Sequence, residues 1–133
     1  HARLIEKNMG RSGLAGNIKF FPDGQRLLDF LFCTGEGEHR ADDASYILLL
    51  DIRMPKVDGL EALRRIKEDP ELRKIPVIVF TTTDDPGEVD RCHALGCSQF
   101  IIKPVNYMNF IEVIDQIGRF LSVVQVPRIH KAL

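Results

Sequence analysis

Three polar residues with complementary chemistry each follow an apolar segment of this sequence: Asp51, Thr81 and Lys103. A carboxylate can act as a nucleophile and form an aspartyl phosphate. A hydroxyl can donate a hydrogen bond to a phosphoryl oxygen, and an ammonium can pair with the phosphoryl charge. Each residue alone has an ordinary explanation as a turn, edge or surface residue. Brought together, they would suit phosphoryl transfer to Asp51, with Mg2+ neutralising the phosphoryl donor.

The three apolar segments predict strands that bring these residues to one edge of a sheet. The first two are continuous apolar runs, which is typical of strands covered on both faces in a parallel sheet. The carboxyl ends of the strands form the binding crevice of an open parallel sheet. The segments are residues 46–50, 77–80 and 98–102.

Helices are predicted between the strands, so the fold class is α/β with a parallel sheet. Asp23, Asp58 and Asp85 are candidate N-caps. Pro86 suits a first helical position and Gly96 a left-handed helix stop. The expected helices carry apolar residues at Leu27, Leu28, Leu31 and Phe32, at Leu60, Leu63 and Ile66, and at Phe110, Val113, Ile114, Ile117, Phe120 and Leu121.

The composition indicates one globular domain. The 133 residues are 44% hydrophobic and 28% charged. The balance of 18 basic against 19 acidic residues argues against a nucleic-acid partner. No apolar run approaches the ~20 residues that span a membrane, and the first residues lack a signal-peptide pattern, so a cytoplasmic location is expected. Cys33, Cys92 and Cys97 are expected to be small buried thiols rather than metal ligands.

Three motifs resemble those of CheY-like response regulator receivers. The segment Leu48–Gly59, with Asp51 after three leucines, resembles the phosphoacceptor segment. Ile75–Thr81 resembles the fourth strand with its switch threonine. Phe100–Pro104 resembles the fifth strand, with a lysine before a proline of the kind that can follow a cis peptide bond. The resemblance covers the chain after Ile18, and three motifs at the family's spacing make it highly specific.

The resemblance implies a role for each residue at the centre of these motifs. Asp51 would be the phosphoacceptor and a Mg2+ ligand, and the backbone carbonyl of Arg53 would be a second ligand. Thr81 and Lys103 would bind the phosphoryl oxygens. Phe100 would be the aromatic side chain that turns inward when Thr81 moves, favoured by apolar burial because it has no hydroxyl.

Residues beside the site are expected to tune it. Arg53 and Thr83 occupy positions that, in the family, affect how quickly the acyl phosphate hydrolyses, and Thr82 stands where many receivers have a smaller residue. An arginine at this position could stabilise the phosphoryl charge or obstruct an incoming water. The remaining matches are expected to be structural: Pro55, Gly59 and Pro104.

The resemblance implies a flavodoxin-like, doubly wound sheet of five parallel strands in the order 2-1-3-4-5, an order taken from the family. Its second strand is expected at Ile18–Phe21. Its first strand should carry an acidic pair for Mg2+, yet the sequence opens with a predicted helix, Ala2–Met9. We expect the first strand to precede residue 1, with a rearranged sheet as the alternative. The expected domains are a receiver at 1–122 and an apolar tail at 123–133.

Other acidic residues are not expected to bind Mg2+. Asp42-Asp43 lies in the polar loop Gly35–Ser45, at the amino end of the sheet. Asp84-Asp85 lies at the carboxyl end but is better suited to capping the helix that starts at Pro86, and Asp58 is also better suited to a helix cap.

The expected partner is a sensor histidine kinase. No further domain follows the last helix, so we expect a stand-alone receiver that signals through its fourth helix, fifth strand and fifth helix by a shift between pre-existing shapes. The loop Gly35–Ser45 and the tail resemble those of small receivers paired with phytochrome-type kinases. The tail would either be solvated or pack on a partner chain, which would make a homodimer.

Three other functions compete with this interpretation. A pseudo-receiver would act only as an interaction scaffold, and would lack the acidic pair for Mg2+. A haloacid-dehalogenase-type phosphatase expects a second aspartate where Arg53 stands. A flavodoxin-like flavin binder expects a phosphate loop rich in Ser, Thr and Gly, which the sequence does not contain.

Overall fold

The computed structural model describes residues 5, 7 and 18–131. The helix predicted at Ala2–Met9 therefore falls almost wholly outside the described residues. The chain divides into two compact units. One consists of Phe21–Ile102 and Val126–Leu133, and the other of His1–Phe20 and Lys103–Gln125. Each unit is described below by itself.

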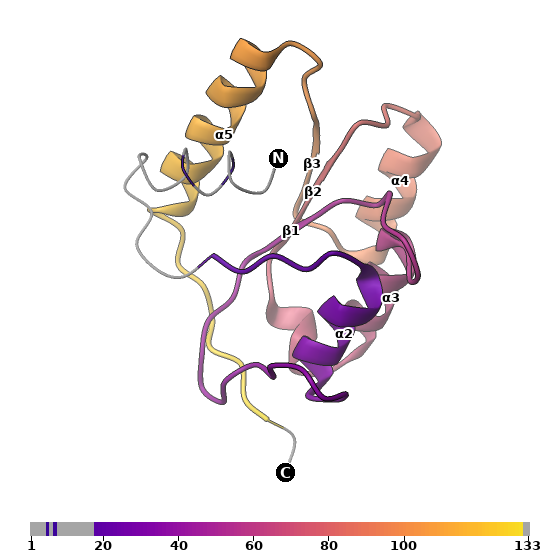
Figure 1. Cartoon of the computed structure of the whole chain (residues 1–133), viewed down its shortest axis with the longest axis vertical. Coiled ribbons are helices and arrows are strands. Elements are labelled where there is room, and N and C mark those ends of the chain that lie inside the picture. The colour runs from indigo at the N-terminus through magenta and orange to yellow at the C-terminus, as the bar shows by residue number, and fades with distance from the viewer. Residues whose placement is uncertain (1–4, 6, 8–17, 132–133) are drawn as a thin grey trace. The chain divides into compact units, whose positions relative to one another are not determined.

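Three parallel strands form the sheet of the larger unit: β1 (Leu48–Leu50), β2 (Val77–Thr81) and β3 (Gln99–Ile102). They lie side by side in the order β1-β2-β3 (Figure 1). Leu50 pairs with Val79, and Thr81 pairs with Ile102. These strands confirm the third, fourth and fifth strands of the predicted receiver sheet, with boundaries within two residues of those expected.

The strand predicted at Ile18–Phe21 is wrong: these residues form neither a strand nor a helix. A strand is stable only where its backbone N–H and C=O groups pair with a neighbour. In the expected order that neighbour is the first strand, for which the sequence offers no segment. Phe21 is held by its side chain instead, with its ring 5.1 Å from that of Phe30.

Three helices of the larger unit begin where an aspartate caps them. Asp23 accepts a hydrogen bond from the backbone of Arg26 at the start of α2 (Gly24–Phe32). Asp58 and Asp85 do the same for α3 (Gly59–Glu68) and α4 (Pro86–Leu95). The left-handed conformation of Gly96, with φ 106°, ends α4. These caps and this stop confirm the helix boundaries expected from the sequence.

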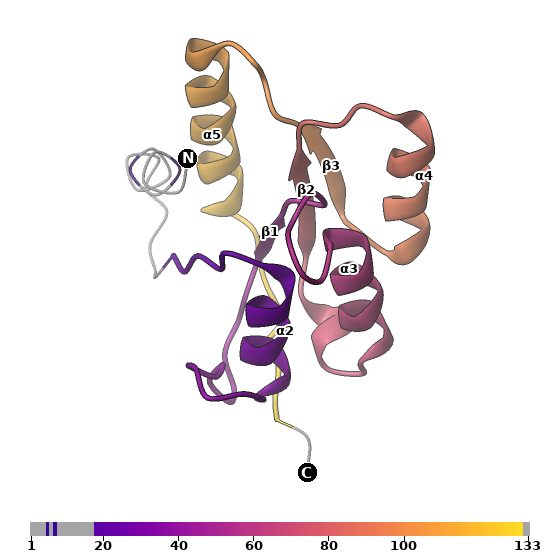
Figure 2. The ribbon, with the colours of Figure 1, turned by 45° about the vertical axis from the view of Figure 1, so that its right-hand side comes forward.

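One hydrophobic core joins the helices to the sheet. In the larger unit α2, α3 and α4 form a layer against the strands (Figure 2). The short 3-10 helix η1 (Leu72–Lys74) connects α3 to β2. The centre of the hydrophobic core consists of residues with almost no exposed surface: Leu50, Leu63, Ile66, Leu72, Val77, Val79, Cys92 and Ile129. The presence of Ile129 in this set shows that the C-terminal segment belongs to the core.

The C-terminal segment Val126–Lys131 packs on its own chain, contrary to both expectations for the tail. Ala44 and Ile129 form an antiparallel bridge with hydrogen bonds of 3.3 and 2.8 Å, and Ile129 has no exposed surface. Arg40 is itself buried and donates to the carbonyls of Leu31 and His130. An apolar side chain next to an open backbone edge has a burial site within reach, so it has no need of a second chain.

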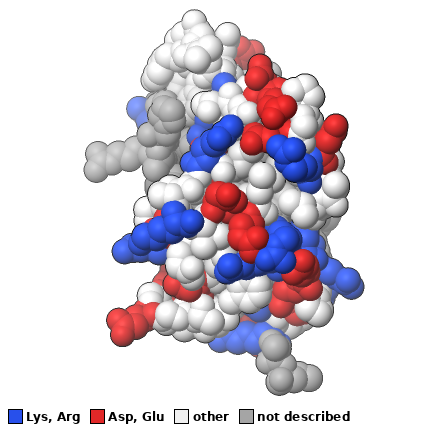
Figure 3. Space-filling view, turned by 90° about the vertical axis from the view of Figure 1, so that its right-hand side faces the viewer, with Lys and Arg blue, Asp and Glu red and all other residues white. Residues whose placement is uncertain are grey.

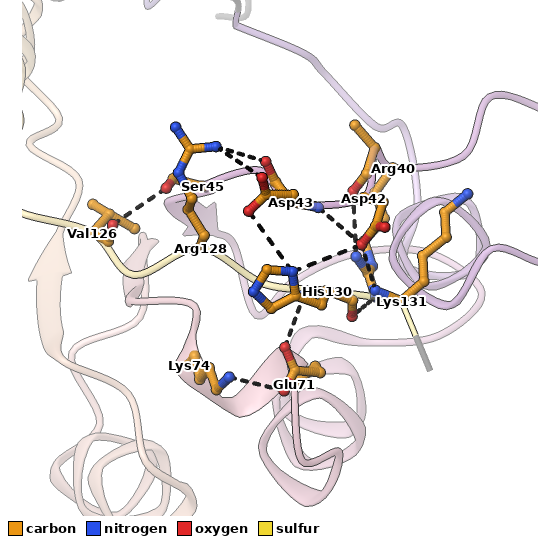
Figure 4. A network of polar contacts seen from close by, with 11 residues as sticks. Arg40, Asp42, Asp43, Ser45, Glu71, Lys74, Val126, Arg128, His130 and Lys131 are labelled. Atoms are coloured by element: carbon orange, nitrogen blue, oxygen red, sulfur yellow. Dashed lines mark hydrogen bonds and ion pairs between the residues drawn. The ribbon is translucent and has the colours of Figure 1, made fainter. Parts of the chain in front are cut away.

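Acidic side chains fasten the same segment from both sides (Figure 4). Asp42 accepts from the backbone of Lys131 at 2.8 Å, and Glu71 of the η1 region accepts from the backbone of His130 at 2.8 Å. Arg128 binds Asp43 through the backbone carbonyl at 2.9 Å and the carboxylate at 3.5 Å. Asp42 and Asp43, which were not expected to bind Mg2+, therefore hold the C-terminal segment through Lys131 and Arg128.

The smaller unit contains α5 (Tyr107–Leu121), the longest helix among the described residues. Asn106 caps it by accepting from the backbone of Met108 and Asn109. The burial of Phe110, Ile114 and Ile117 confirms the predicted stripe, except that Phe120 is 58% exposed. In the part of the chain that the structure describes, no helix has the length and apolar character needed to cross a membrane.

Candidate functional site

Asp51 lies immediately after β1, at the carboxyl end of the sheet. Asp51 is half-buried as a residue, and its Oδ1 atom accepts a hydrogen bond of 2.9 Å from the backbone N–H of Arg53. This short turn fixes the start of the loop that leads to α3. The carboxylate that the sequence predicted to be a nucleophile is therefore positioned by the backbone two residues further on.

Close backbone packing holds the loop after Asp51. A Cβ atom at Gly59 would lie 2.3 Å from the Cα of Ile52 and 2.5 Å from the carbonyl oxygen of Asp51, so only glycine fits. The Gly59 N–H also donates to the carbonyl of Ile52 at 3.2 Å. The carbonyl of Pro55 accepts from Gly24 at 3.4 Å. Gly59 and Pro55 therefore fix the path of the loop after Asp51 through close packing and backbone hydrogen bonds.

Thr81 is the last residue of β2 and has no exposed surface. Its Oγ1 atom is buried and finds no hydrogen-bond partner among the residues that the structure describes. A buried hydroxyl without a partner costs about 1–3 kcal/mol relative to a bonded one. Because β1 and β2 are adjacent and parallel, Asp51 and Thr81 lie at the carboxyl ends of neighbouring strands.

The remaining predicted residues follow or line β3. Phe100 pairs with Val79 and is half-buried against the core. Lys103 directly follows Ile102, the strand partner of Thr81, and is half-buried. Lys103 and Pro104 belong to the smaller unit, so only their place in the chain is described. The peptide bond before Pro104 is trans, the form that even proline prefers, so the expected cis tendency is not realised.

Arg53 has a side-chain partner that the sequence analysis missed. Its Nη2 atom lies 3.6 Å from Oε2 of Glu88, in the first turn of α4. The spacing Asp85-x-x-Glu88 could have drawn attention to Glu88, but as part of a helix cap rather than as a partner of Arg53. Thr82 is exposed, and Thr83 Oγ1 accepts from the backbone of Asp85 at 3.4 Å.

The donor atoms near Asp51 suit a hard cation such as Mg2+. Carboxylate and carbonyl oxygens are its preferred ligands, and Mg2+ usually takes one or two carboxylates together with phosphate oxygens and water. Asp51 and the backbone carbonyl of Arg53 would supply one oxygen each. Among the described residues no group of three or more His, Cys, Asp or Glu side chains could hold a metal. The residues present therefore fit part of a Mg2+ site.

The pKa values of two acidic residues and two cysteines away from Asp51 are shifted by their surroundings. The backbone N–H of Lys131 holds the pKa of Asp42 below its usual value, and Lys74 does the same for Glu71. Burial raises the pKa of the Cys92 thiol to about 11 and also raises the pKa of Cys97. Cys92 and Cys97 are buried and Cys33 is half-buried, so the expectation of buried thiols is confirmed for two of the three.

The surface around α3 and α4 carries acidic and basic side chains side by side (Figure 3). On α3, Glu61 contacts both Arg64 and Arg65, and Arg64 also contacts Glu68 at 2.9 Å. The two arginines hold the pKa of Glu61 at about 2. Positive and negative charges are paired locally on this face.

The family model of the response regulator receiver domain matches residues 2–115. A receiver domain crystal structure from Rhodospirillum rubrum is 43% identical, with a TM-score of 0.90 over 98% of this chain and 92% of that one. Response regulator Rcp1 of Synechocystis, solved in a Mn2+-bound form, is 29% identical, with a TM-score of 0.84 over 95% and 90%. The phosphorylated cyanobacterial phytochrome response regulator RcpA is 30% identical, with a TM-score of 0.83 over 95% and 89%.

Proposed function

This chain belongs to the response regulator receiver family, and on that basis we propose that it accepts a phosphoryl group on Asp51 from a histidine kinase and signals by changing conformation. The observation that carries the proposal is the pair at the ends of β1 and β2. A carboxylate there is held by the backbone of Arg53, beside a strand that ends in a buried, unpartnered hydroxyl at Thr81.

The proposed chemistry is a single transfer. An Asp51 carboxylate oxygen attacks phosphorus, the bond between phosphorus and the kinase histidine nitrogen breaks, and the histidine leaves. The Thr81 hydroxyl donates to a phosphoryl oxygen and Lys103 pairs with the phosphoryl charge. Asp51 and the Arg53 carbonyl would hold Mg2+, which when bound neutralises phosphoryl charge. Hydrolysis by water would then return the carboxylate and release inorganic phosphate.

The switch and its timing complete the proposal. Thr81 is drawn toward the phosphoryl group because its hydroxyl gains a partner there, and Phe100 moves with it. Arg53, Thr82 and Thr83 set how long the acyl phosphate survives. The protein turns over no separate substrate: it undergoes phosphotransfer and its own dephosphorylation only.

The proposed partner is a sensor histidine kinase of the phytochrome type, because RcpA is a phytochrome response regulator. We also propose a homodimer, since three large apolar side chains at the start of the smaller unit's helix are exposed: Val105, Tyr107 and Met108. A cytoplasmic location agrees with three free cysteines. The proposed domain assignment is a receiver at 1–122 followed by a tail at 123–133, part of which packs into the receiver core through Ile129.

Phosphorylation with acetyl phosphate and Mg2+ tests the proposal by intact mass. The parent should gain about 80 Da, the mass of one phosphoryl group, and Asp51→Asn should gain nothing. Asp84→Asn is the control, because Asp84 is an exposed aspartate beyond the end of β2. A gain in Asp51→Asn would mean that another aspartate is the acceptor, and no gain in the parent would favour the scaffold function.

A further inference from the structure

Arg53 contacts two parts of the larger unit at once. Its backbone N–H donates to Asp51 at 2.9 Å, while its guanidinium lies 3.6 Å from the carboxylate of Glu88 on α4. The two side chains differ in burial: Arg53 is 63% exposed and Glu88 only 14%. The Arg53 side chain is therefore largely in contact with solvent, whereas the Glu88 side chain is mostly enclosed by the protein.

The Glu88 carboxylate is available for an ion pair with Arg53 because it does not cap α4. A glutamate three residues after an N-cap often binds the backbone N–H of the cap residue. Here that N–H, of Asp85, donates to Thr83 Oγ1 instead. The Oε2 atom of Glu88 is buried and has no hydrogen bond within the described part of the chain, and Arg91 lies 4.0 Å from the other oxygen. A buried carboxylate oxygen depends on nearby positive charge, and Arg53 supplies it.

Resting on the proposed function, we propose that Glu88 is a positioning residue for Arg53 and competes with the phosphoryl group for it. In the unmodified protein Glu88 draws the guanidinium onto α4. A phosphoryl group on Asp51 carries a charge of about −1.5 to −2 and three acceptor oxygens, which suit a guanidinium better than one carboxylate oxygen does. Arg53 then leaves Glu88, and the first turn of α4 loses its charge partner, so phosphorylation reaches α4 through this exchange.

The unmodified state can be tested directly by NMR of the Arg53 side-chain Nε–H group. Glu88→Gln should shift this signal. Asp90→Asn should not, because Asp90 is an exposed acid on the same helix and serves as the matched control. An Arg53 signal that is unchanged in Glu88→Gln would overturn the proposal, whatever happens on phosphorylation.

The competition is tested with beryllium fluoride, a stable mimic of the phosphoryl group, titrated in Mg2+ and followed by NMR. Glu88→Gln should bind it about two- to five-fold more tightly, the range expected for release of a partly exposed ion pair. In an Arg53→Gln background the same change should have no more effect than Asp90→Asn. An equal gain in both backgrounds would show that Glu88 acts through its charge alone and would overturn the positioning role.

The two proposals fail in different ways. A parent protein that takes up neither acetyl phosphate nor beryllium fluoride overturns the proposed function, and the inference with it. A parent that gains the phosphoryl group but shows no gain in Glu88→Gln, or the same gain without Arg53, overturns the inference alone.

Discussion

Ile129→Ala should strongly destabilise the protein, although Ile129 lies close to the end of the chain. The side chain has no exposed surface and packs in the same core as Leu50 and Leu63. Its backbone bridges Ala44, and both neighbours, Arg128 and His130, are bound by acidic residues. The substitution removes three buried carbons while leaving those backbone contacts possible.

The expected loss follows from the burial. Truncation of a fully buried isoleucine to alanine costs about 2–5 kcal/mol, from lost transfer free energy and from the cavity left behind. A urea m-value of about 2 kcal/mol/M, the middle of the range for small proteins, converts this into a fall of about 1–2.5 M in the unfolding midpoint. Val123→Ala should change the free energy of unfolding by no more than about 0.5 kcal/mol, because Val123 is 73% exposed in the same tail.

Urea unfolding followed by far-UV circular dichroism measures the effect, since the sequence has no tryptophan. The loss should be the same at low and high protein concentration, because Ile129 is buried in its own chain. A loss below about 0.5 kcal/mol would refute the burial of the tail. A loss that grows with protein concentration would show that the tail packs on a second copy, because stability that depends on association follows mass action.

Three further predictions concern the Thr81 hydroxyl, the close packing at Gly59 and the acidic residues that hold the C-terminal segment. Thr81→Val should leave the urea midpoint unchanged or raise stability by up to about 1 kcal/mol, since it replaces an unpartnered hydroxyl with a methyl group of similar size; a large loss would mean that the hydroxyl is bonded. Gly59→Ala should cost about 1–3 kcal/mol in the same assay, because its Cβ would meet backbone atoms at 2.3 and 2.5 Å, whereas Gly37→Ala, with nothing within 4 Å, should be neutral. Folding lowers the pKa values of Asp42 and Glu71, so in acid the unfolded chain binds more protons than the folded one. The stability that these two carboxylates contribute is therefore present above about pH 4 to 5 and is lost as the pH falls. Asp42→Asn should make the decrease of the urea midpoint with falling pH shallower.

The elements that the sequence predicted well have local causes. Apolar runs that stop at Asp51 and at Thr81 became β1 and β2, and both residues lie at the carboxyl end of the sheet. Helix boundaries followed Asp58, Asp85 and Gly96, because capping and left-handed stops depend on a few neighbouring residues. The close approach of Gly59 to the loop agrees with the glycine of the phosphoacceptor motif.

The predictions that failed needed partners distant in sequence. Ile18–Phe21 has strand-forming residues, but no ladder forms because pairing requires a neighbouring backbone. The contact between Arg53 and Glu88 joins the loop after β1 to the first turn of α4, and neither residue's sequence context indicates the other.

By itself, the sequence determined the order of strands and helices and the placement of Asp51 and Thr81 at strand ends, because apolar runs, caps and stops act over a few residues. Only the tertiary structure decided where the tail lies and what Asp42 and Asp43 do. Ala44 and Ile129 bridge across most of the chain, and Arg40 reaches the carbonyl of His130. Such contacts depend on which surfaces the folded core leaves open, and burial of Ile129 in that core then holds the segment to its own chain.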